Sequence, residues 1–516
     1  MDFQSHRPVG FLGQGDQYLP EAIQDLERAL KNAQRFLRYD TLRMSSAKLE
    51  EVAHVLVEFA EDVHNDIGIW RSVEEYNLDF FGTRLPLVPE VNHKKKQRGI
   101  HQYRVRHFLW VLYSELIPDL VLSPSHHDLR LLAEQVANFL KKQFASIPRD
   151  SGVKAFLTQP NEFGWDVKRK LIWLGTHSYL LRNSFQNYIA DQGGKTDIPV
   201  VDDFICQQTT SWSGLGVIDI LAGTLNLAEK QCGDLRSWYD RHTAYFRVLH
   251  LTGPTMEVEN IVNGKPYSIS VGEKANQFKV GQIILGSLVP WGGEWYWSGS
   301  QSVLDGVSED VLRQLRSDFL QETPTIAYRY CDEVAERARE KVKDHYREFV
   351  GYHGDDLVVY PDGLSMAGDL QKQQRLKYES LPSEVVSSLM KKHNLPSTSP
   401  RMSFPPEVIE DSNGIGAYFN PEEGLEIMRG FNTLVNGFKK RGVALTEDEE
   451  NAIRAFFLSK LISPRFVGKL IQQYGDESVA AAFLIRSYKD KNYVDYLLRR
   501  FKGHFYRKRY PRLTFV

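Results

Sequence analysis

One long segment, from Tyr245 to Ser298, alternates hydrophobic and polar residues with a period of two, whereas the sequence on both sides has helical periodicity. Hydrophobic and acidic residues alternate from Met256 to Glu259 and lead to Asn263-Gly264, a pair suited to the positive φ angles of a two-residue hairpin. Alternation resumes from Tyr267 to Val271, so the return strand has one buried face. These features predict a small antiparallel β-barrel at residues 244–300.

Three tryptophans, Trp291, Trp295 and Trp297, lie close together near the end of this segment. We expect them to fill a small core. The alternative is an exposed aromatic face that stacks on bases or on a partner chain. Glu294 is the only charged residue from Trp291 to Ser300, so no basic residue accompanies the rings, and the core interpretation is favoured.

The order of short motifs in this segment resembles a small β-barrel module of uncharacterised bacterial proteins. The motifs are Asn263-Gly264, then Val280-Gly281-Gln282-Ile283-Ile284, then Gly293-Glu294-Trp295 and Ser298-Gly299. The resemblance covers residues 245–299 and implies no known activity. Some of those proteins also carry a cysteine-rich metal-binding tail, which this chain lacks.

The rest of the chain is predicted to be mainly helical, which makes the expected fold class α+β, mainly α. Leu357–Tyr360 is a short strand candidate, and a helix is expected from Pro421 to Lys440, with further helices after Thr446 and Ser463. Helical spacing of hydrophobic residues is found in residues 20–39, 47–66, 125–144, 165–190, 214–243, 308–320 and 325–350.

Prolines and serines between Leu395 and Gly416 suppress regular structure and predict a linker. The expected domains are a helical N-terminal region (1–243), the barrel (244–300), a second helical region with a short strand hairpin (301–394), the linker (395–416) and a C-terminal helical bundle with a basic tail (417–516).

Composition adds little that is specific. The chain has 516 residues and a formal net charge of −2, so its overall charge does not attract nucleic acid. The three cysteines are far apart in sequence, which argues against a disulfide framework or a zinc site and favours a reducing compartment. The first residues do not resemble a secretory signal, and no segment has 18 uninterrupted apolar residues, so we expect a cytoplasmic bacterial protein without membrane contact.

Cations gather in two segments. The first runs from Val91 to Ser114 without an acidic residue, and the second follows Asp495, where basic residues alternate with aromatic ones. Such segments can neutralise phosphates while rings stack on bases. A solvated basic loop and a tail packed on its own fold are the simpler interpretations. The candidate nucleic-acid-binding residues are Lys94, Lys95, Lys96, Arg98, Arg104, Arg106, Arg499, Arg500, Lys502, Arg507, Lys508 and Arg509.

Two Glu-x-x-His motifs, Glu51 to His54 and Glu61 to His64, have the spacing used in di-iron helical bundles. Such a site needs its motifs on facing helices. Here both lie on one predicted helix, with their faces about 80° apart. A solvated helix face is therefore expected, and no metal site.

Two other groups of residues could support chemistry. His127-Asp128 is the dipeptide of helical metal-dependent phosphohydrolases, with His93, His101 or His107 as further ligands, although Asp128 at a helix start is explained by capping. The loop from Tyr352 to Asp356 contains an imidazole and two carboxylates, enough for acid-base work, but a turn before a strand is expected.

The function predicted from the sequence is that of a non-enzymatic binding or scaffold protein. Its expected partners are nucleic acid or another polyanion, or a protein assembly, contacted through the basic segments and the barrel, and no cofactor is expected. The alternative is a metal-dependent phosphohydrolase that uses His127, Asp128 and a distant His and Asp.

Overall fold

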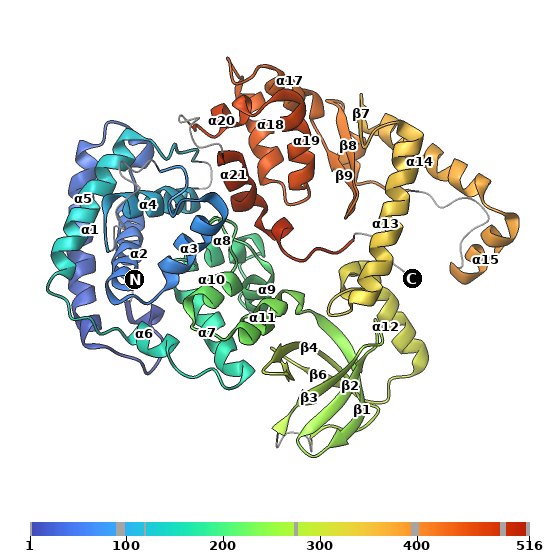
Figure 1. The fold of residues 1–516 in the computed structure, drawn as a ribbon, viewed down its shortest axis with the longest axis horizontal. Coiled ribbons are helices and arrows are strands. Elements are labelled where there is room, and N and C mark those ends of the chain that lie inside the picture. Colours follow the sequence, from blue (N-terminus) through green and yellow to red (C-terminus); the bar gives the residue numbers. More distant parts are fainter. Residues whose placement is uncertain are drawn as a thin grey trace. The chain divides into compact units, whose positions relative to one another are not determined.

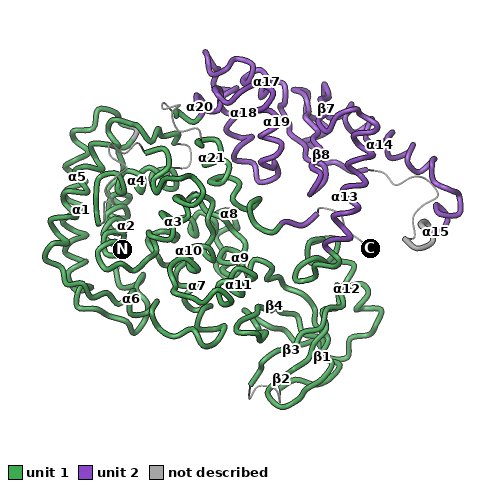
Figure 2. The backbone as a smooth tube through the Cα atoms, in the orientation of Figure 1, with its two compact units in different colours: residues 1–334, 483–508, 516 green, residues 335–482, 509–515 purple. Residues whose placement is uncertain are grey.

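A computed structural model of the chain describes residues 3–88, 99–117, 120–272, 277–393, 402–485 and 492–511 (Figure 1). These residues are mainly helical and contain a small closed β-barrel, which confirms the predicted fold class. The chain forms two compact units (Figure 2). Unit 1 contains residues 1–334 and 483–508, and unit 2 contains residues 335–482 and 509–515.

The first part of unit 1 is built around α2 (Ser46–Asn65), which is buried along most of its length. Ser45 caps its first turn by accepting a hydrogen bond from the amide of Lys48. Phe59 of this helix stacks on Phe108, with ring centroids 4.6 Å apart, and Phe108 stacks in turn on Trp212 at 5.1 Å. This aromatic core holds together helices that are far apart in sequence.

The other helices of this part, all in unit 1, are α1 (Leu19–Ala33), α3 (Ile69–Phe81), α4 (Gln102–Leu116), α5 (His127–Phe144), α6 (Gly152–Leu157), α7 (Gly164–His177), α8 (Arg182–Asp191), α9 (Ile198–Gln207), α10 (Val217–Thr224) and α11 (Glu229–Ser237). After the barrel come α12 (Glu309–Glu322) and, close to the C-terminus, α21 (Tyr493–Lys502). None of the helices in the described part of the chain combines the length and the apolar character needed to cross a bilayer.

The barrel forms where the period of two predicts it. Its strands are β1 (Thr243–Thr252), β2 (Thr255–Asn260), β3 (Pro266–Ser270), β4 (Ile283–Trp291) and β5 (Glu294–Trp297), and β6 (Ser302–Leu304) adds to β4 outside the ring. Strand β1 pairs with both β2 and β4, and the parallel pair Ile269 and Trp295 joins β3 to β5, so the ring closes. The other pairs are antiparallel, as predicted.

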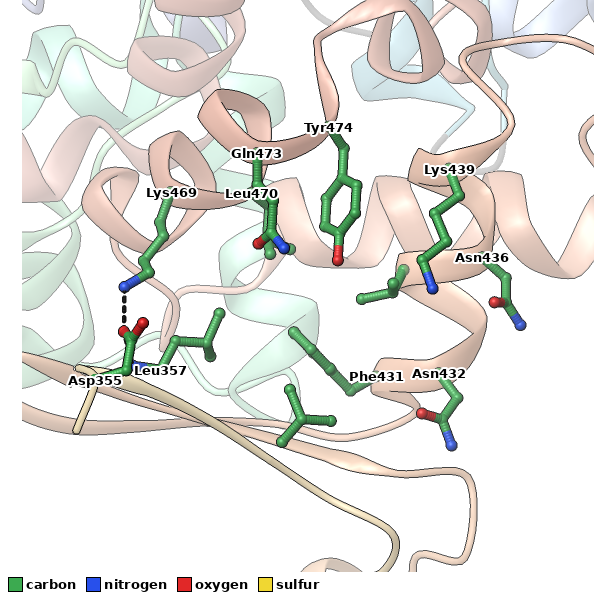
Figure 3. A pocket seen from close by; sticks show the side chains of 12 residues that line it. Asp355, Leu357, Phe431, Asn432, Asn436, Lys439, Lys469, Leu470, Gln473 and Tyr474 are labelled. Atoms are coloured by element: carbon green, nitrogen blue, oxygen red, sulfur yellow. Dashed lines mark hydrogen bonds and ion pairs between the residues drawn. The ribbon is translucent and has the colours of Figure 1, made fainter. Parts of the chain in front are cut away.

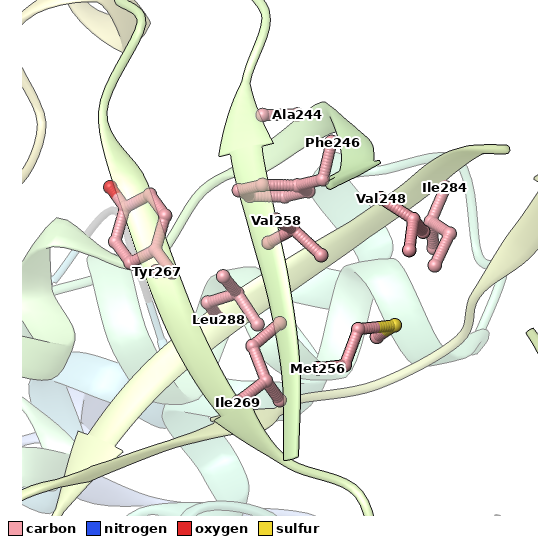
Figure 4. Packing of buried hydrophobic residues seen from close by; sticks show 9 residues of the cluster. All are labelled: Ala244, Phe246, Val248, Met256, Val258, Tyr267, Ile269, Ile284 and Leu288. Carbon is pink, nitrogen blue, oxygen red and sulfur yellow. The ribbon is translucent and has the colours of Figure 1, made fainter. Parts of the chain in front are cut away.

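The barrel core consists of alternate side chains from its strands (Figure 4). Trp295 and Trp297 pack against this core, which confirms the expectation for these two rings. Trp291 is also buried, but it packs on Trp238 of the helical part, with ring centroids 6.4 Å apart, and donates from Nε1 to the carbonyl of Asn161 at 3.1 Å. One of the three tryptophans therefore attaches the barrel to its helical neighbours.

A buried ion-pair cluster makes a second attachment. Asp202 of α9 pairs with Lys168 of α7 and with Nη2 of Arg241 at 2.5 Å. Arg241 lies just before β1. Both cations also donate to Oγ of Ser298, directly after β5. One carboxylate thus holds both ends of the barrel segment against the helices.

Unit 2 combines helices with a three-stranded sheet of order β7-β8-β9. The strands are β7 (Leu357–Tyr360), β8 (Ile415–Asn420) and β9 (Gly424–Met428), and both pairings are antiparallel. The helices are α13 (Asp332–His353, which begins in unit 1), α14 (Gly363–Ser380), α15 (Ser383–His393), α16 (Pro406–Ile409), α17 (Phe431–Lys439), α18 (Glu447–Leu458), α19 (Pro464–Tyr474) and α20 (Glu477–Ala482).

The hairpin of β8 and β9 overturns the expected helix from Pro421 to Lys440. Gly424 has φ of 113° and Gly430 has φ of 63°, and both glycines interrupt helical conformation, so only α17 is helical in this range. One face of the sheet packs on Phe349, Met366 and Leu370 of α13 and α14. The start of the predicted linker, residues 395–401, lies outside the described residues.

Candidate functional site

A pocket of about 360 Å³ lies in unit 2, on the other face of the sheet, between β7, α17 and α19 (Figure 3). This volume is near the lower end for small-molecule sites, which begin at roughly 300 Å³. The walls include five apolar side chains, which are Leu357, Val359, Phe431, Val435 and Leu470. A bound group would therefore rest on an apolar surface.

The polar groups of the pocket come mainly from two helices. Asn432, Asn436 and Lys439 lie on one face of α17, because their spacing of four and three residues follows the helical repeat. Gln473 and Tyr474 stand at the end of α19, and Figure 3 shows Lys439 reaching toward the same space as the Tyr474 hydroxyl. Lys439 is exposed and has no ion-pair partner in the part of the chain that the structure describes.

The second lysine of the pocket is neutralised. Lys469 of α19 donates from Nζ to Oδ1 of Asp355 at 2.5 Å and also pairs with Asp356. The hydrogen bond from Lys469 holds the pKa of Asp355 well below its usual range. Asp355 is therefore ionised and paired at neutral pH, and Lys439 is the cation that stays available to a ligand.

The structure divides the residues of the predicted acid-base loop between two places. Asp355 and Asp356 face Lys469, whereas Nδ1 of His353 lies 3.6 Å from Oδ2 of Asp369 on α14. Tyr360 also donates to Asp369, at 2.8 Å. The imidazole and the two neighbouring carboxylates therefore do not share one site. Tyr352 and His353 end α13, so only residues 354–356 form the expected bend before β7.

The predicted cations of the first basic segment that the structure describes have partners in unit 1. Arg104 donates from Nε and Nη2 to the two carboxylate oxygens of Glu74, each at 2.6 Å. Arg106 is buried and donates from Nε to the carbonyl of Pro124 at 2.7 Å. The other candidates in this segment, Lys94, Lys95, Lys96 and Arg98, lie outside the described residues.

The first three cations of the C-terminal segment pack on aromatic rings or inside unit 1. Arg499 lies over the ring of Phe80 at 3.9 Å and over that of Tyr506 at 4.3 Å. Arg500 is buried 4.5 Å from the ring centroid of Trp110. Lys502 is completely buried.

The last three cations form ion pairs. Arg507 pairs with Asp219 at 3.2 Å and donates to the carbonyls of Gln207, the last residue of α9, and of Gln208, the next residue. Lys508 pairs with two aspartates of unit 1, at 3.2 and 2.8 Å. Arg509, which belongs to unit 2, donates from Nε and Nη2 to the two oxygens of Glu423 at 2.9 and 2.7 Å.

The close approach of Arg507 depends on a glycine. A Cβ at Gly216 would lie 1.9 Å from Nη2 of Arg507, so another residue there would displace the guanidinium. The described C-terminal cations are thus built into their own units. Nucleic-acid binding by the twelve candidate residues stays a prediction, and these contacts favour the interpretation of a packed tail.

The Glu-x-x-His motifs show a clear error in the expected exposure. His54 and Glu61 are buried inside unit 1, where a solvated helix face is expected. Arg7 donates from Nη1 and Nη2 to the two oxygens of Glu61, each at 2.7 Å, and Ser151 donates to the same carboxylate at 2.6 Å. Residues remote in sequence supply the partners that make this burial possible.

Three residues of the hydrolase alternative, Asp128, His101 and His107, have structural roles, and His93 lies outside the described residues. Asp128 is fully buried in the first turn of α5, where Oδ2 accepts the backbone N–H of Tyr39 at 2.9 Å. His101 caps the start of α4, and His107 is buried among aromatic rings. Within the described residues, no group of three or more His, Cys, Asp or Glu side chains has an arrangement that could hold a metal ion.

The pocket residues were not identified from the sequence, apart from Asp355. They belong to a strand and two helices that are separated by up to about a hundred residues, and amides, one lysine and one tyrosine form no recognisable motif. The spacing of Asn432, Asn436 and Lys439 on one helix face is the one local pattern that points to a shared polar surface.

Comparison with known proteins gives one match. Residues 43–201 match the family described as "Protein of unknown function (DUF3843)". No curated protein and no solved structure matches the chain. The matched segment begins just before α2 and ends within α9, so it covers much of the helical part of unit 1, including the surroundings of Glu61, and neither the barrel nor the pocket of unit 2.

Proposed function

We propose that this chain is a non-enzymatic binding or scaffold protein, and that the pocket of unit 2 takes up a segment of a protein partner. The observation that carries the proposal is the composition of the pocket. An apolar floor lies next to the side-chain amides of Asn432, Asn436 and Gln473 and the unpaired ammonium group of Lys439. Protein segments offer the same mixture of apolar and polar groups.

The chemistry of these side chains supports binding over acid-base catalysis. Amides do not titrate, so they orient a ligand and transfer no proton in the usual pH range. The carboxylate of Asp355 is paired with Lys469, and its lowered pKa makes it a weak base. The pocket therefore provides contacts that hold a ligand in place.

The surroundings of the predicted phosphate-binding cations favour a protein partner. Arg104, Arg507 and Arg509 each form an ion pair with a carboxylate of the same unit. Phosphate binding would have to compete with these pairs. The pocket itself offers a single available cation, whereas nucleic-acid grooves follow the backbone with several.

The test is a selection from a library of random peptides displayed on phage, with the full chain as the target. Asn436→Trp fills the pocket from an exposed position on α17. Gln472→Trp is the matched control, because Gln472 is exposed on α19 and does not line the pocket. Peptides that bind the wild type and Gln472→Trp equally, and Asn436→Trp at least about tenfold more weakly, would support the proposal. Equal binding to all three would overturn it.

A further inference from the structure

Strand β7 is an edge strand, and its register shows which of its backbone groups face outward. Its residues pair with β8 from Leu357 with Tyr418 to Tyr360 with Ile415. The carbonyl of Asp356 accepts the N–H of Phe419 at 2.8 Å. In an antiparallel ladder the bonded residues alternate, so Val358 and Tyr360 also face β8, and the backbone groups of Leu357 and Val359 point away from it.

The outward groups of Val359 are available for another strand. The N–H of Leu357 is satisfied by Oδ1 of Asp355 at 3.0 Å. Within the described residues, the N–H and C=O of Val359 have no partner, and the residue is 53% exposed. Natural edge strands are usually protected by a charge, a proline or a cover, and this hydrophobic position has none of these in its own side chain.

The same two residues line the pocket. Side chains of a strand alternate between its faces, so Leu357 and Val359 both point into the pocket while Val358 and Tyr360 point into the core on the opposite face. A strand added beside β7 would place every second side chain over the pocket. The edge and the pocket therefore form one continuous surface.

We infer that the occupant is an extended segment of a partner protein that adds to β7 as a further strand and places an acidic side chain against Lys439. This inference rests on the proposed function and names its ligand. Backbone bonds to Val359 supply the direction and register, the apolar floor holds the alternate side chains, and Lys439 selects a carboxylate. Because β7 has only four residues, backbone hydrogen bonds contribute little to the binding free energy, and the side chains of the pocket determine the specificity.

The first test uses peptides enriched on the wild type and removes the outward donor. Val359→Pro deletes an N–H that the ladder with β8 does not use, and proline is tolerated at such edge positions. Val359→Thr is the control, because it keeps the N–H and the branched shape. We expect Val359→Pro to bind at least about threefold more weakly than Val359→Thr, since one net hydrogen bond is lost.

The second test leaves the protein unaltered, so it does not depend on the folding of a variant. The amides of an enriched peptide are methylated one at a time. If the peptide adds as a strand, binding falls at alternate amides, because only every second N–H faces β7. Strand addition would be overturned if methylation weakened binding at none of the amides, or if the sensitive amides did not alternate along the peptide.

The acidic contact is tested by exchanging charges. Lys439→Gln should weaken a peptide that contains Asp or Glu by about three- to tenfold. Lys439→Glu should weaken it further and should bind a peptide in which Lys replaces the acidic residue better than the wild type does. A peptide without an essential acidic residue would contradict this part of the inference.

The outcomes separate the inference from the proposed function. Binding that is lost in Asn436→Trp but unchanged in Val359→Pro and after methylation would overturn strand addition and leave the pocket as a binding site. Binding that survives Asn436→Trp would overturn the proposed function itself. A wild-type chain that self-associates, and that becomes monomeric as Val359→Pro, would show that a second copy of this chain occupies the edge and would overturn the inference of a different partner.

Discussion

Arg182 donates from Nη1 to Oε2 of Glu58 over 2.6 Å, and both side chains are buried in the interior of unit 1. The pair joins α8 to α2. Nε and Nη2 of Arg182 have no hydrogen-bond partner among the described residues, so Glu58 is the carboxylate that compensates this charge. Buried charges that lose their partner are costly.

We predict that Glu58→Ala lowers the free energy of unfolding by about 3–5 kcal/mol, because it leaves the guanidinium buried and unpaired. The measurement is urea unfolding followed by tryptophan fluorescence. All nine tryptophans lie in unit 1, so this fluorescence reports unit 1 without a contribution from unit 2. The double variant Glu58→Leu with Arg182→Met should lose less free energy of unfolding than Glu58→Ala, because it leaves no buried charge without a partner. An equal or larger loss in the double variant would show that packing, not the unpaired charge, dominates.

Unit 1 should lose stability in mild acid because several of its histidines are buried in the neutral form. Burial lowers the pKa of His107 and His242 to about 3, and that of His6 and His101 to about 4. A lowered folded pKa means that the unfolded chain binds protons first. The stabilisation is thus complete above the unfolded value of about 6.5 and is lost as the pH falls toward the folded values.

For a histidine such as His107, which is 1% exposed, the expected loss between pH 7.5 and pH 5 is about 2 kcal/mol. The check is the free energy of unfolding at both pH values for the wild type and for His107→Phe, which keeps a ring among Trp70 and Trp110 but does not titrate. The difference between the two pH values should be about 2 kcal/mol smaller in the variant. An unchanged difference would mean that His107 is not protonated on unfolding in this range.

The features that were predictable from the sequence are those that depend on neighbours in the chain. The alternation from Met256 to Glu259 predicts a hairpin, and β2 and β3 form it. The expected two-residue turn is wrong, because residues 261–265 lie between the two strands and only Gly264 of the Asn263-Gly264 pair has a positive φ. The expected helix from Pro421 to Lys440 was wrong because pairing with β8 outweighs the helical preference of the acidic residues after Pro421.

The features that could not be predicted depend on contacts between remote residues. Glu61 pairs with Arg7, and Glu58 pairs with Arg182. No local sequence pattern predicts either pair. For the same reason a charged helix face was expected to be solvated. Likewise, Lys439 and Lys469 look alike in sequence, but only Lys469 meets aspartates from the loop before β7, so which lysine a ligand can use is decided by the fold.

The attachment of the barrel should depend on Asp202. Asp202→Asn leaves Lys168 and Arg241 close together without a compensating charge, so we predict a loss of about 3 kcal/mol in the free energy of unfolding of unit 1. Asp310→Asn is the control, because its ion pair with Arg313 is exposed, and a change within about 0.5 kcal/mol is expected. Similar values for the two variants would show that the cluster does not hold the barrel.

The C-terminal segment should contribute to stability through Arg507. Its guanidinium lies 3.9 Å from the ring centroid of Tyr239 and bonds to Asp219 and to two backbone carbonyls. We predict that Arg507→Ser lowers the free energy of unfolding of unit 1 by about 2–4 kcal/mol, since a charged hydrogen-bonding group is removed from a mostly buried site. Arg313→Ser, at an exposed helix position, should change it by less than about 0.5 kcal/mol.

The same variant separates a structural tail from a phosphate-binding one. Binding of a labelled oligonucleotide is measured across a salt series for the wild type, Arg507→Ser and Arg313→Ser. Phosphate contacts make affinity fall as salt rises, and the loss of one contact reduces the slope of log K against log salt by about 1. We expect Arg507→Ser to unfold more easily with no specific change in that slope. A reduced slope at unchanged stability would instead establish Arg507 as a nucleic-acid contact. An arginine that binds phosphate gives up its internal bonds, so its replacement would change the salt dependence of binding and leave the free energy of unfolding unchanged.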